Sequence, residues 1–160
     1  MAVRVLCFAD IEAEVAPVPM SKYDVIPLIL AAGKGVRMKS DLPKVALEVC
    51  GQPMIKRIVN VSAAISDEKP CVVVGSGADY VREALEDVPV HWIYQKEQLG
   101  TGHAVAQARS DLAESGKNVI ILCGDTPLLR PETLARLCAH HIGSGAVATP
   151  VTTELDNPKG

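Results

Sequence analysis

Short apolar runs alternate along the chain with stretches in which apolar residues recur every three or four positions. The run from Val25 to Ala31 carries no charge, as expected of a strand that is buried on both faces. The predicted strands are, in chain order, residues 25–31, 71–74, 88–94, 119–122 and 146–151. Within the third of these, alternation predicts that one face carries Val88, Val90, Trp92 and Tyr94.

The stretches between the strands have the spacing of amphipathic helices. Pro53 suits the first turn of a helix, and Thr101 can cap a helix through its side chain. Gly116 marks the end of the helix that follows Thr101. The predicted helices are, in chain order, residues 53–65, 80–85, 103–113 and 131–140.

This alternation of strand, loop and helix predicts an α/β fold with a mainly parallel, Rossmann-like sheet and helices on both faces. The expected architecture is a three-layer α/β/α sandwich. In such sheets, ligands bind at the carboxyl ends of the strands. Three loops with unusual chemistry, at residues 33–44, 95–102 and 124–127, all follow predicted strands, so we expect them at one edge of the sheet.

Residues 1–24 do not share this pattern. They contain Pro17 and Pro19 with scattered acids, and Met20 would be a natural start for a protein that opens on the strand at Val25. We therefore expect residues 1–24 to be a mobile extension and residues 25–160 to form the folded part.

Composition excludes several classes of function. Hydrophobic residues make up 48% and charged residues 22%, which is ordinary for a soluble globular protein. Aromatic residues at 3% and a pI near 5.8 argue against nucleic-acid binding. The five cysteines lack CxxC or Cys/His spacing, which predicts free thiols in the cytoplasm. No apolar run is long enough to span a membrane, and a secretory signal would need a longer apolar core than the first residues have, so we expect a cytoplasmic protein.

Positive charge is concentrated in the loop of residues 33–44. Lys34, Arg37, Lys39 and Lys44 against Asp41 give the loop a net charge of +3, whereas the whole chain is −3. Cations on a glycine-bearing loop after a buried strand indicate a phosphate site. The loop lacks the third small residue of a dinucleotide-binding motif, as does Gly75-Ser76-Gly77, and the spacing of a P-loop is absent.

The same loop resembles the signature of sugar-phosphate nucleotidyltransferases. Residues 30–44 read Leu-Ala-Ala-Gly-Lys-Gly-Val-Arg-Met-Lys-Ser-Asp-Leu-Pro-Lys. Gln-Lys-Glu-Gln-Leu-Gly-Thr-Gly-His at 95–103 and Gly-Asp-Thr-Pro-Leu at 124–128 narrow the resemblance. Together they are similar to the uridylyltransferase (pyrophosphorylase) domain of the bifunctional N-acetylglucosamine-1-phosphate uridyltransferase/glucosamine-1-phosphate acetyltransferase family, over residues 25–160.

The resemblance implies an Mg²⁺-dependent enzyme that joins UTP to N-acetylglucosamine 1-phosphate and releases pyrophosphate. Arg37 and Lys44 would be the catalytic residues, holding triphosphate oxygens, and Asp125 would bind Mg²⁺. Gln95 would read the uracil. The implied nucleotide-binding residues are Leu30, Ala31, Ala32, Gly33, Gly35, Lys44, Gln95, Gly100, Thr101 and Gly124. His103 is expected to be structural, because this chemistry needs no such general base.

The sequence also departs from the family. Val36 stands where the family usually has threonine, and the chain stops at Gly160, before the sugar-binding half, the second Mg²⁺ ligand and the trimerising acetyltransferase domain. The expectation is a C-terminally truncated, nucleotide-binding part of a nucleotidyltransferase domain, whose oligomeric state is open. Two alternatives remain: transfer with another nucleotide or sugar, and a nucleotide-binding module without turnover.

Overall fold

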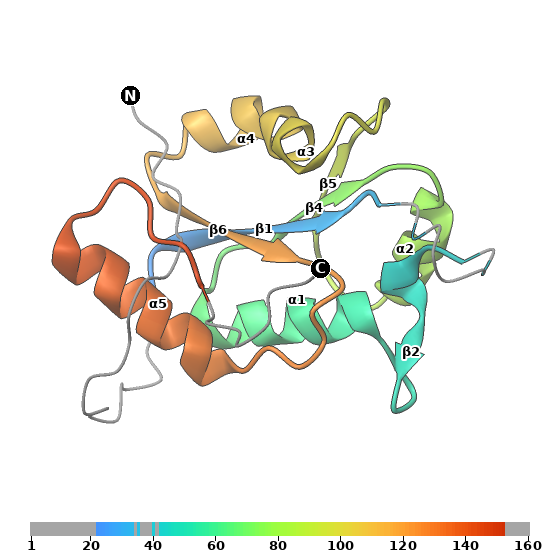
Figure 1. The fold of residues 1–160 in the computed structure, drawn as a ribbon, viewed down its shortest axis with the longest axis horizontal. Helices are drawn as coiled ribbons and strands as arrows, with labels where there is room; N and C mark the ends of the chain where they lie inside the picture. Colours follow the sequence, from blue (N-terminus) through green and yellow to red (C-terminus); the bar gives the residue numbers. More distant parts are fainter. Residues whose placement is uncertain (1–21, 34, 36–39, 41, 153–160) are drawn as a thin grey trace, which may run out of the picture.

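The computed structural model describes residues 22–33, 35, 40 and 42–152. Its centre is a parallel sheet of β1 (Val25–Ala31), β4 (Cys71–Val74), β5 (His91–Tyr94) and β6 (Asn118–Cys123), in the order β5-β4-β1-β6 (Figure 1). The central strand β1 pairs Leu28 with Cys71 on one side and with Ile121 on the other. The apolar runs at 25–31, 71–74 and 119–122 therefore form strands, as the sequence predicts.

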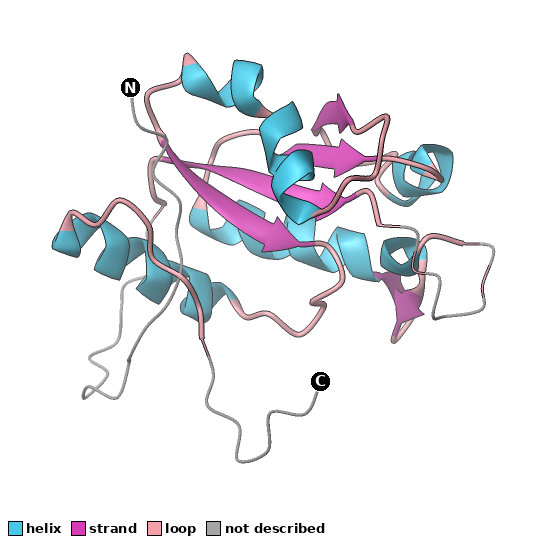
Figure 2. Cartoon of the chain, turned by 45° about the horizontal axis from the view of Figure 1, so that its top comes forward, coloured by secondary structure: helices cyan, strands magenta, loops and turns pink. Residues whose placement is uncertain are grey.

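Helices cover both faces of this sheet, which confirms the three-layer α/β/α sandwich. On one face lie α1 (Met54–Ile65), α2 (Ala78–Ala84) and α5 (Pro131–Ser144); on the other lie α3 (Thr101–Gln107) and α4 (Arg109–Ala113) (Figures 1 and 2). Each face has its own hydrophobic core. Ile29, for example, packs toward α1, while Leu28 packs toward α3, as the two-residue period of a strand requires.

A small irregular unit lies between β1 and α1. It consists of the 3₁₀ turn η2 (Lys44–Ala46) and an antiparallel pair, β2 (Glu48–Val49) with β3 (Gln52–Pro53). Pro53, predicted in the first turn of the helix, instead ends β3 and is the N-cap of α1. The Arg57 guanidinium donates to the carbonyl of Val49. This contact holds the pair against the first turns of the helix.

The predicted strand at 88–94 is shorter in the structure, where β5 spans His91–Tyr94, and its end is more exposed than expected. Ile93 is 6% exposed, whereas Tyr94 is 57% exposed and Trp92 is half-buried. The alternation itself is confirmed for Val88, Val90 and Trp92, which pack with the core on one face of the sheet, while Ile93 lies in the core on the other face. Trp92 also lies under the guanidinium of Arg82, whose Cζ is 5.7 Å from the ring centroid.

Four other predicted features also differ. Residues 146–151 form no strand beyond an isolated bridge at Ala148, and Val147 and Val151 are exposed, since no strand of the described residues pairs along them. Thr101 is the first residue of α3 and not its cap, because Gly100, with φ of 103°, takes that position. The predicted helix 103–113 divides at Ala108 into α3 and α4, and α5 runs to Ser144.

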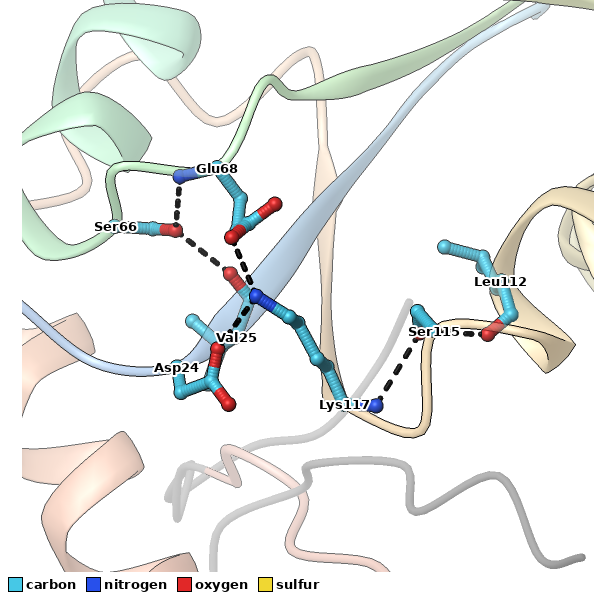
Figure 3. Close-up of polar contacts among 7 residues, drawn as sticks. All are labelled: Asp24, Val25, Ser66, Glu68, Leu112, Ser115 and Lys117. Atoms are coloured by element: carbon cyan, nitrogen blue, oxygen red, sulfur yellow. Dashed lines mark hydrogen bonds and ion pairs between the residues drawn. The ribbon is translucent and has the colours of Figure 1, made fainter.

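A group of ionic contacts joins the amino-terminal ends of three strands (Figure 3). The ammonium of Lys117, which precedes β6, lies 2.8 Å from Asp24 before β1 and 2.5 Å from Glu68 before β4. The Ser66 hydroxyl donates to the carbonyl of Val25 and accepts from the amide of Glu68. These contacts fix the strands at the edge of the sheet opposite the three loops of interest.

The proposed extension, residues 1–24, lies outside the described residues except for its last three. Of these, Tyr23 packs against the core on the α1 side of the sheet, and its amide donates to the carbonyl of Ile65. Among the described helices, none is long and apolar enough to cross a membrane.

Candidate functional site

A pocket of about 440 Å³ opens at the carboxyl edge of the sheet. Segments from all three motifs line it: the end of β1 with its loop, the segment between β5 and α3, and the end of β6. The lining residues are Leu30, Ala32, Gly33, Gly35, Lys44, Val45, Gln95, Gln98, Gly100, Thr101, Ala104, Cys123 and Asp125. The pocket follows β1 and β6, where the direction of the chain's progress across the sheet reverses, which is the usual ligand site of such sheets.

Lys44 and Asp125 form an ion pair in this pocket. The Lys44 ammonium donates to Asp125 Oδ2 at 2.8 Å, and the two side chains are 39% and 38% exposed. Lys44 stands at the start of η2, and Asp125 directly follows β6. The pair therefore joins the loops after the two neighbouring strands and offers solvent both a cation and a carboxylate.

Gln95 is a buried polar residue in the same pocket, with 3% of its surface exposed. Its backbone amide donates to the carbonyl of Val74, and its side-chain amide lies 3.3 Å from the carbonyl of Gly100 and 2.9 Å from Nδ1 of His103. A carboxamide fixed in this way presents a directional hydrogen-bonding group to a ligand.

Two predicted binding residues support the pocket without lining it. Ala31 is 2% exposed within β1. Gly124 donates from its backbone to the carbonyl of Leu30 at 3.0 Å, and a Cβ at Gly124 would lie 3.0 Å from that oxygen and 3.1 Å from both Ile55 and Val45. A larger residue at Gly124 would push the ends of β1 and β6 apart.

Gly35 lets the basic loop pass close to Lys44. Its φ is 59°, and a Cβ there would lie 2.7 Å from Cβ of Lys44. Residues with a Cβ rarely adopt such a φ, and a Cβ would also lie too close to Lys44, so this position requires glycine. Arg37, the other predicted catalytic residue, lies outside the described residues, as do Lys34 and Lys39.

The sequence did not single out four lining residues: Val45, Gln98, Ala104 and Cys123. Cys123 directly precedes the Gly124-Asp125 motif, and Gln98 lies within the second motif, so proximity to the motifs was the available signal. Burial of the thiol, followed by the charge of Asp125, raises the pKa of Cys123 although the residue as a whole is exposed. A raised pKa makes this thiol a poor nucleophile.

The donor atoms fit a magnesium ion that arrives with a nucleotide better than a permanently bound metal. Asp125 supplies one carboxylate, and within the described residues no group of three or more His, Cys, Asp or Glu side chains could hold a metal. Mg²⁺ commonly takes one or two carboxylates and completes its shell with phosphate oxygens and water.

Most of the chain matches a known protein family. The profile of the MobA-like NTP transferase domain matches residues 27–158. The chain belongs to this family. Its function class is therefore that of a nucleotidyltransferase.

Individual relatives indicate which members of the family the chain resembles. The chain is 48% identical over 133 residues to the bifunctional protein GlmU of Heliobacterium modesticaldum, a match that covers 83% of this chain and 29% of that protein. A second GlmU, from Pelotomaculum thermopropionicum, is 48% identical over 137 residues, 86% of this chain and 30% of the relative. The chain thus spans about 30% of the length of these relatives. The resemblance to the pyrophosphorylase domain of the bifunctional enzymes is confirmed.

A solved structure supports the fold independently. The crystal structure of a UDP-glucose pyrophosphorylase complexed with UDP-glucose superposes with a TM-score of 0.60 at 18% identity, over 77% of this chain and 55% of that chain. At such low identity the likeness concerns the fold alone. It confirms a nucleotidyltransferase fold.

Proposed function

We propose that this protein transfers a uridylyl group from UTP to N-acetylglucosamine 1-phosphate, giving UDP-N-acetylglucosamine and pyrophosphate. The proposal rests on one observation: all three motifs line the same pocket. That pocket holds a buried carboxamide, Gln95, and an exposed ion pair, Lys44–Asp125. A nucleoside triphosphate needs both kinds of group, one for its base and one for its charged phosphates. Uridine and the amino sugar follow from the family that the three motifs resemble, and the GlmU relatives at 48% identity support that resemblance.

The base would lie against the β5–α3 segment. Gln95 supplies its carboxamide to the base edge, Gly100 and Thr101 enclose the ring, and the apolar side chain of Leu30 lines the same space. The residues before the basic loop, Ala31, Ala32 and Gly33, are small, so the backbone can approach the nucleotide closely.

The triphosphate would lie over Lys44, Gly35 and Asp125. Lys44, together with Arg37, neutralises phosphate oxygens. A sugar-phosphate oxygen then attacks the α-phosphorus, and the new P–O bond forms as the bond to pyrophosphate breaks. Both cations act most strongly on the charge of the transition state. Asp125 would hold the Mg²⁺, which when bound offsets the charge on the phosphates.

The ion pair implies an exchange of partners on binding. In the structure, Lys44 and Asp125 neutralise each other at 2.8 Å. When a metal-bound triphosphate enters, Asp125 gains a cation and Lys44 gains anionic oxygens, so both charges stay paired. This exchange makes binding of nucleotide and metal mutually dependent.

The proposal places residues 25–160 in the nucleotide-binding part of the domain and residues 1–24 in an extension. Cytoplasmic location is part of the proposal, and the four described cysteines, which are free thiols, agree with a reducing compartment.

Turnover with different substrates tests the proposal. Pyrophosphate release and UDP-sugar formation would be measured with Mg²⁺, N-acetylglucosamine 1-phosphate and UTP, CTP or GTP in turn. We expect product with UTP. Product with another nucleotide instead would favour the first alternative, while UTP binding without any product would favour a nucleotide-binding module. Absence of UTP binding would contradict the proposal as a whole.

A further inference from the structure

The side chains of Gln95, His103 and Gln107 form a line of polar groups that leads from the pocket along α3. Gln95 Nε2 lies 2.9 Å from His103 Nδ1, and Gln107 Nε2 lies 3.1 Å from the other ring nitrogen, His103 Nε2. Gln95 lines the pocket and is buried, while His103 and Gln107 are half-buried behind it. Nothing in the proposed chemistry uses His103 or Gln107.

The two amides cannot both donate to the ring. A neutral imidazole has one N–H and one acceptor nitrogen, and a protonated imidazole has two N–H groups. At least one ring nitrogen therefore donates, and the amide that faces it must turn its Oε1 toward the ring. Because the two ends of a carboxamide have nearly the same shape, either amide can make this turn without displacing its neighbours.

The remaining contacts of each amide indicate which one turns. Gln95 Nε2 lies 3.3 Å from the carbonyl of Gly100, and Gln107 Nε2 lies 3.4 Å from the carbonyl of His103. Both carbonyls can only accept. Gln95 has the shorter contact in each comparison and is 3% exposed, so water replaces a bond that it loses less readily than one lost by Gln107. Half-buried Gln107 can turn at lower cost.

We propose that His103 is the Nε2–H tautomer, which donates to Gln107 and accepts from Gln95, and that it thereby determines base selection. With its Nε2 committed to His103 and Gly100, Gln95 offers its Oε1 to the nucleotide. An acceptor at this position pairs with the N3–H of uracil and repels the N3 of cytosine, which is itself an acceptor. His103 and Gln107 are positioning residues that act through Gln95.

The choice of base rests on the proposed function, whereas the tautomer does not. The first arm of the test is therefore independent of any ligand: imidazole ¹⁵N spectra of the free protein at about pH 8.5, where an ordinary histidine is neutral. We expect a pyridine-type Nδ1 and a pyrrole-type Nε2 for His103, assigned by loss of its signals in His103→Phe or, should that variant not fold, by through-bond correlation. A protonated Nδ1 would overturn the proposal.

The second arm measures calorimetric affinities for UTP and CTP with Mg²⁺ at the same pH. His103→Phe should reduce the preference for UTP over CTP by roughly tenfold, the effect of one misdirected hydrogen bond. Gln107→Met should reduce it less. Gln107→Glu, whose carboxylate can only accept from Nε2–H, should keep the preference. His140→Gln, exposed on α5 in the opposite layer, is the matched control.

The outcomes separate the two claims. An unchanged preference in both His103→Phe and Gln107→Met would overturn the positioning role, as would a preference lost in Gln107→Glu. If the wild type bound neither nucleotide, the proposed function would fail, and the ¹⁵N spectra would still decide the tautomer.

Discussion

At the residue scale, the pocket depends on two charged side chains from segments that are far apart in the sequence. Lys44 and Asp125 meet at 2.8 Å because their strands, β1 and β6, are neighbours in the sheet. Both side chains are more than a third exposed, so their attraction is screened by water and contributes little to folding. Their position matters instead for ligands.

We predict that Asp125→Asn separates binding from stability. The free energy of unfolding should change by less than about 1 kcal/mol, as is typical of an exposed ion pair. Magnesium-dependent UTP affinity should fall by about tenfold or more, because the amide has no charge for the metal. Urea unfolding and calorimetry measure the two effects. An equal loss of affinity with and without Mg²⁺ would contradict the metal role of Asp125.

Two glycines provide a matched pair for a stability prediction. Gly77 has φ of 83°, and a Cβ there would lie 2.4 Å from Cγ of Pro43, in the loop that carries Lys44. Gly77→Ala should therefore destabilise the fold by about 1–3 kcal/mol. In Gly102, on α3, a Cβ would meet nothing within 4 Å.

Gly102→Ala should accordingly be neutral or stabilising, by up to about 1 kcal/mol, because alanine favours the helix. Urea denaturation of both variants tests the comparison. Equal effects of the two substitutions would show that the close approach of Gly77 to Pro43 has no energetic consequence.

At the element scale, opposite edges of the sheet have different roles. Figure 3 shows the Lys117 ammonium between Asp24 and Glu68, at the amino-terminal ends of β6, β1 and β4. Hydrogen bonds with Asp24 and then Glu68 raise the pKa of Lys117 to about 12. The carboxyl edge, where the pocket lies, is thus left free to vary in chemistry while the other edge fixes the strands.

The raised pKa of Lys117 predicts how stability depends on pH. A lysine whose pKa is higher in the folded state stabilises the fold fully below its unfolded pKa of about 10.4 and loses this contribution as pH rises through the folded value. The difference in urea midpoint between wild type and Lys117→Met should therefore be present at pH 8 and should shrink as pH approaches 12. A difference that does not change with pH would contradict this account.

The elements also show what the sequence could and could not predict. β1, β4 and β6 were predicted because strands buried on both faces are continuously apolar. The exposure of Tyr94 on β5 and the lack of a strand at 146–151 were not predicted, because an edge position and a missing partner strand are properties of the tertiary structure. The break at Ala108 between α3 and α4 likewise has no glycine or proline to mark it.

For the site, motifs placed after strands were enough to bring Lys44, Gln95 and Asp125 into one pocket. The sequence could not predict the contact of His103 with Gln95, because the contact depends on the orientation of α3 relative to β5. It also could not predict the 3% exposure of Gln95, which as a loop glutamine is ordinarily expected to face solvent.

At the scale of the whole molecule, the central claim is that three separate loops form one site for a uridine nucleotide with Mg²⁺. The fold explains why this is possible, because the parallel strands all point the same way and bring the loops that follow them to one edge of the sheet (Figure 2). The pocket lies at that edge, beside the ends of β1 and β6. The chain's membership of the MobA-like NTP transferase family supports the proposal that a nucleotide binds there.

The most direct measurement is a titration of the ¹⁵N-labelled protein with UTP and Mg²⁺, followed through backbone amide shifts. The account predicts concerted shifts in three segments, at Gly33 to Lys44, Gln95 to Thr101 and Cys123 to Asp125, with a common affinity and no shift near Lys117. Shifts confined to one segment, different affinities among the three, or a response at the amino-terminal ends of the strands would contradict it.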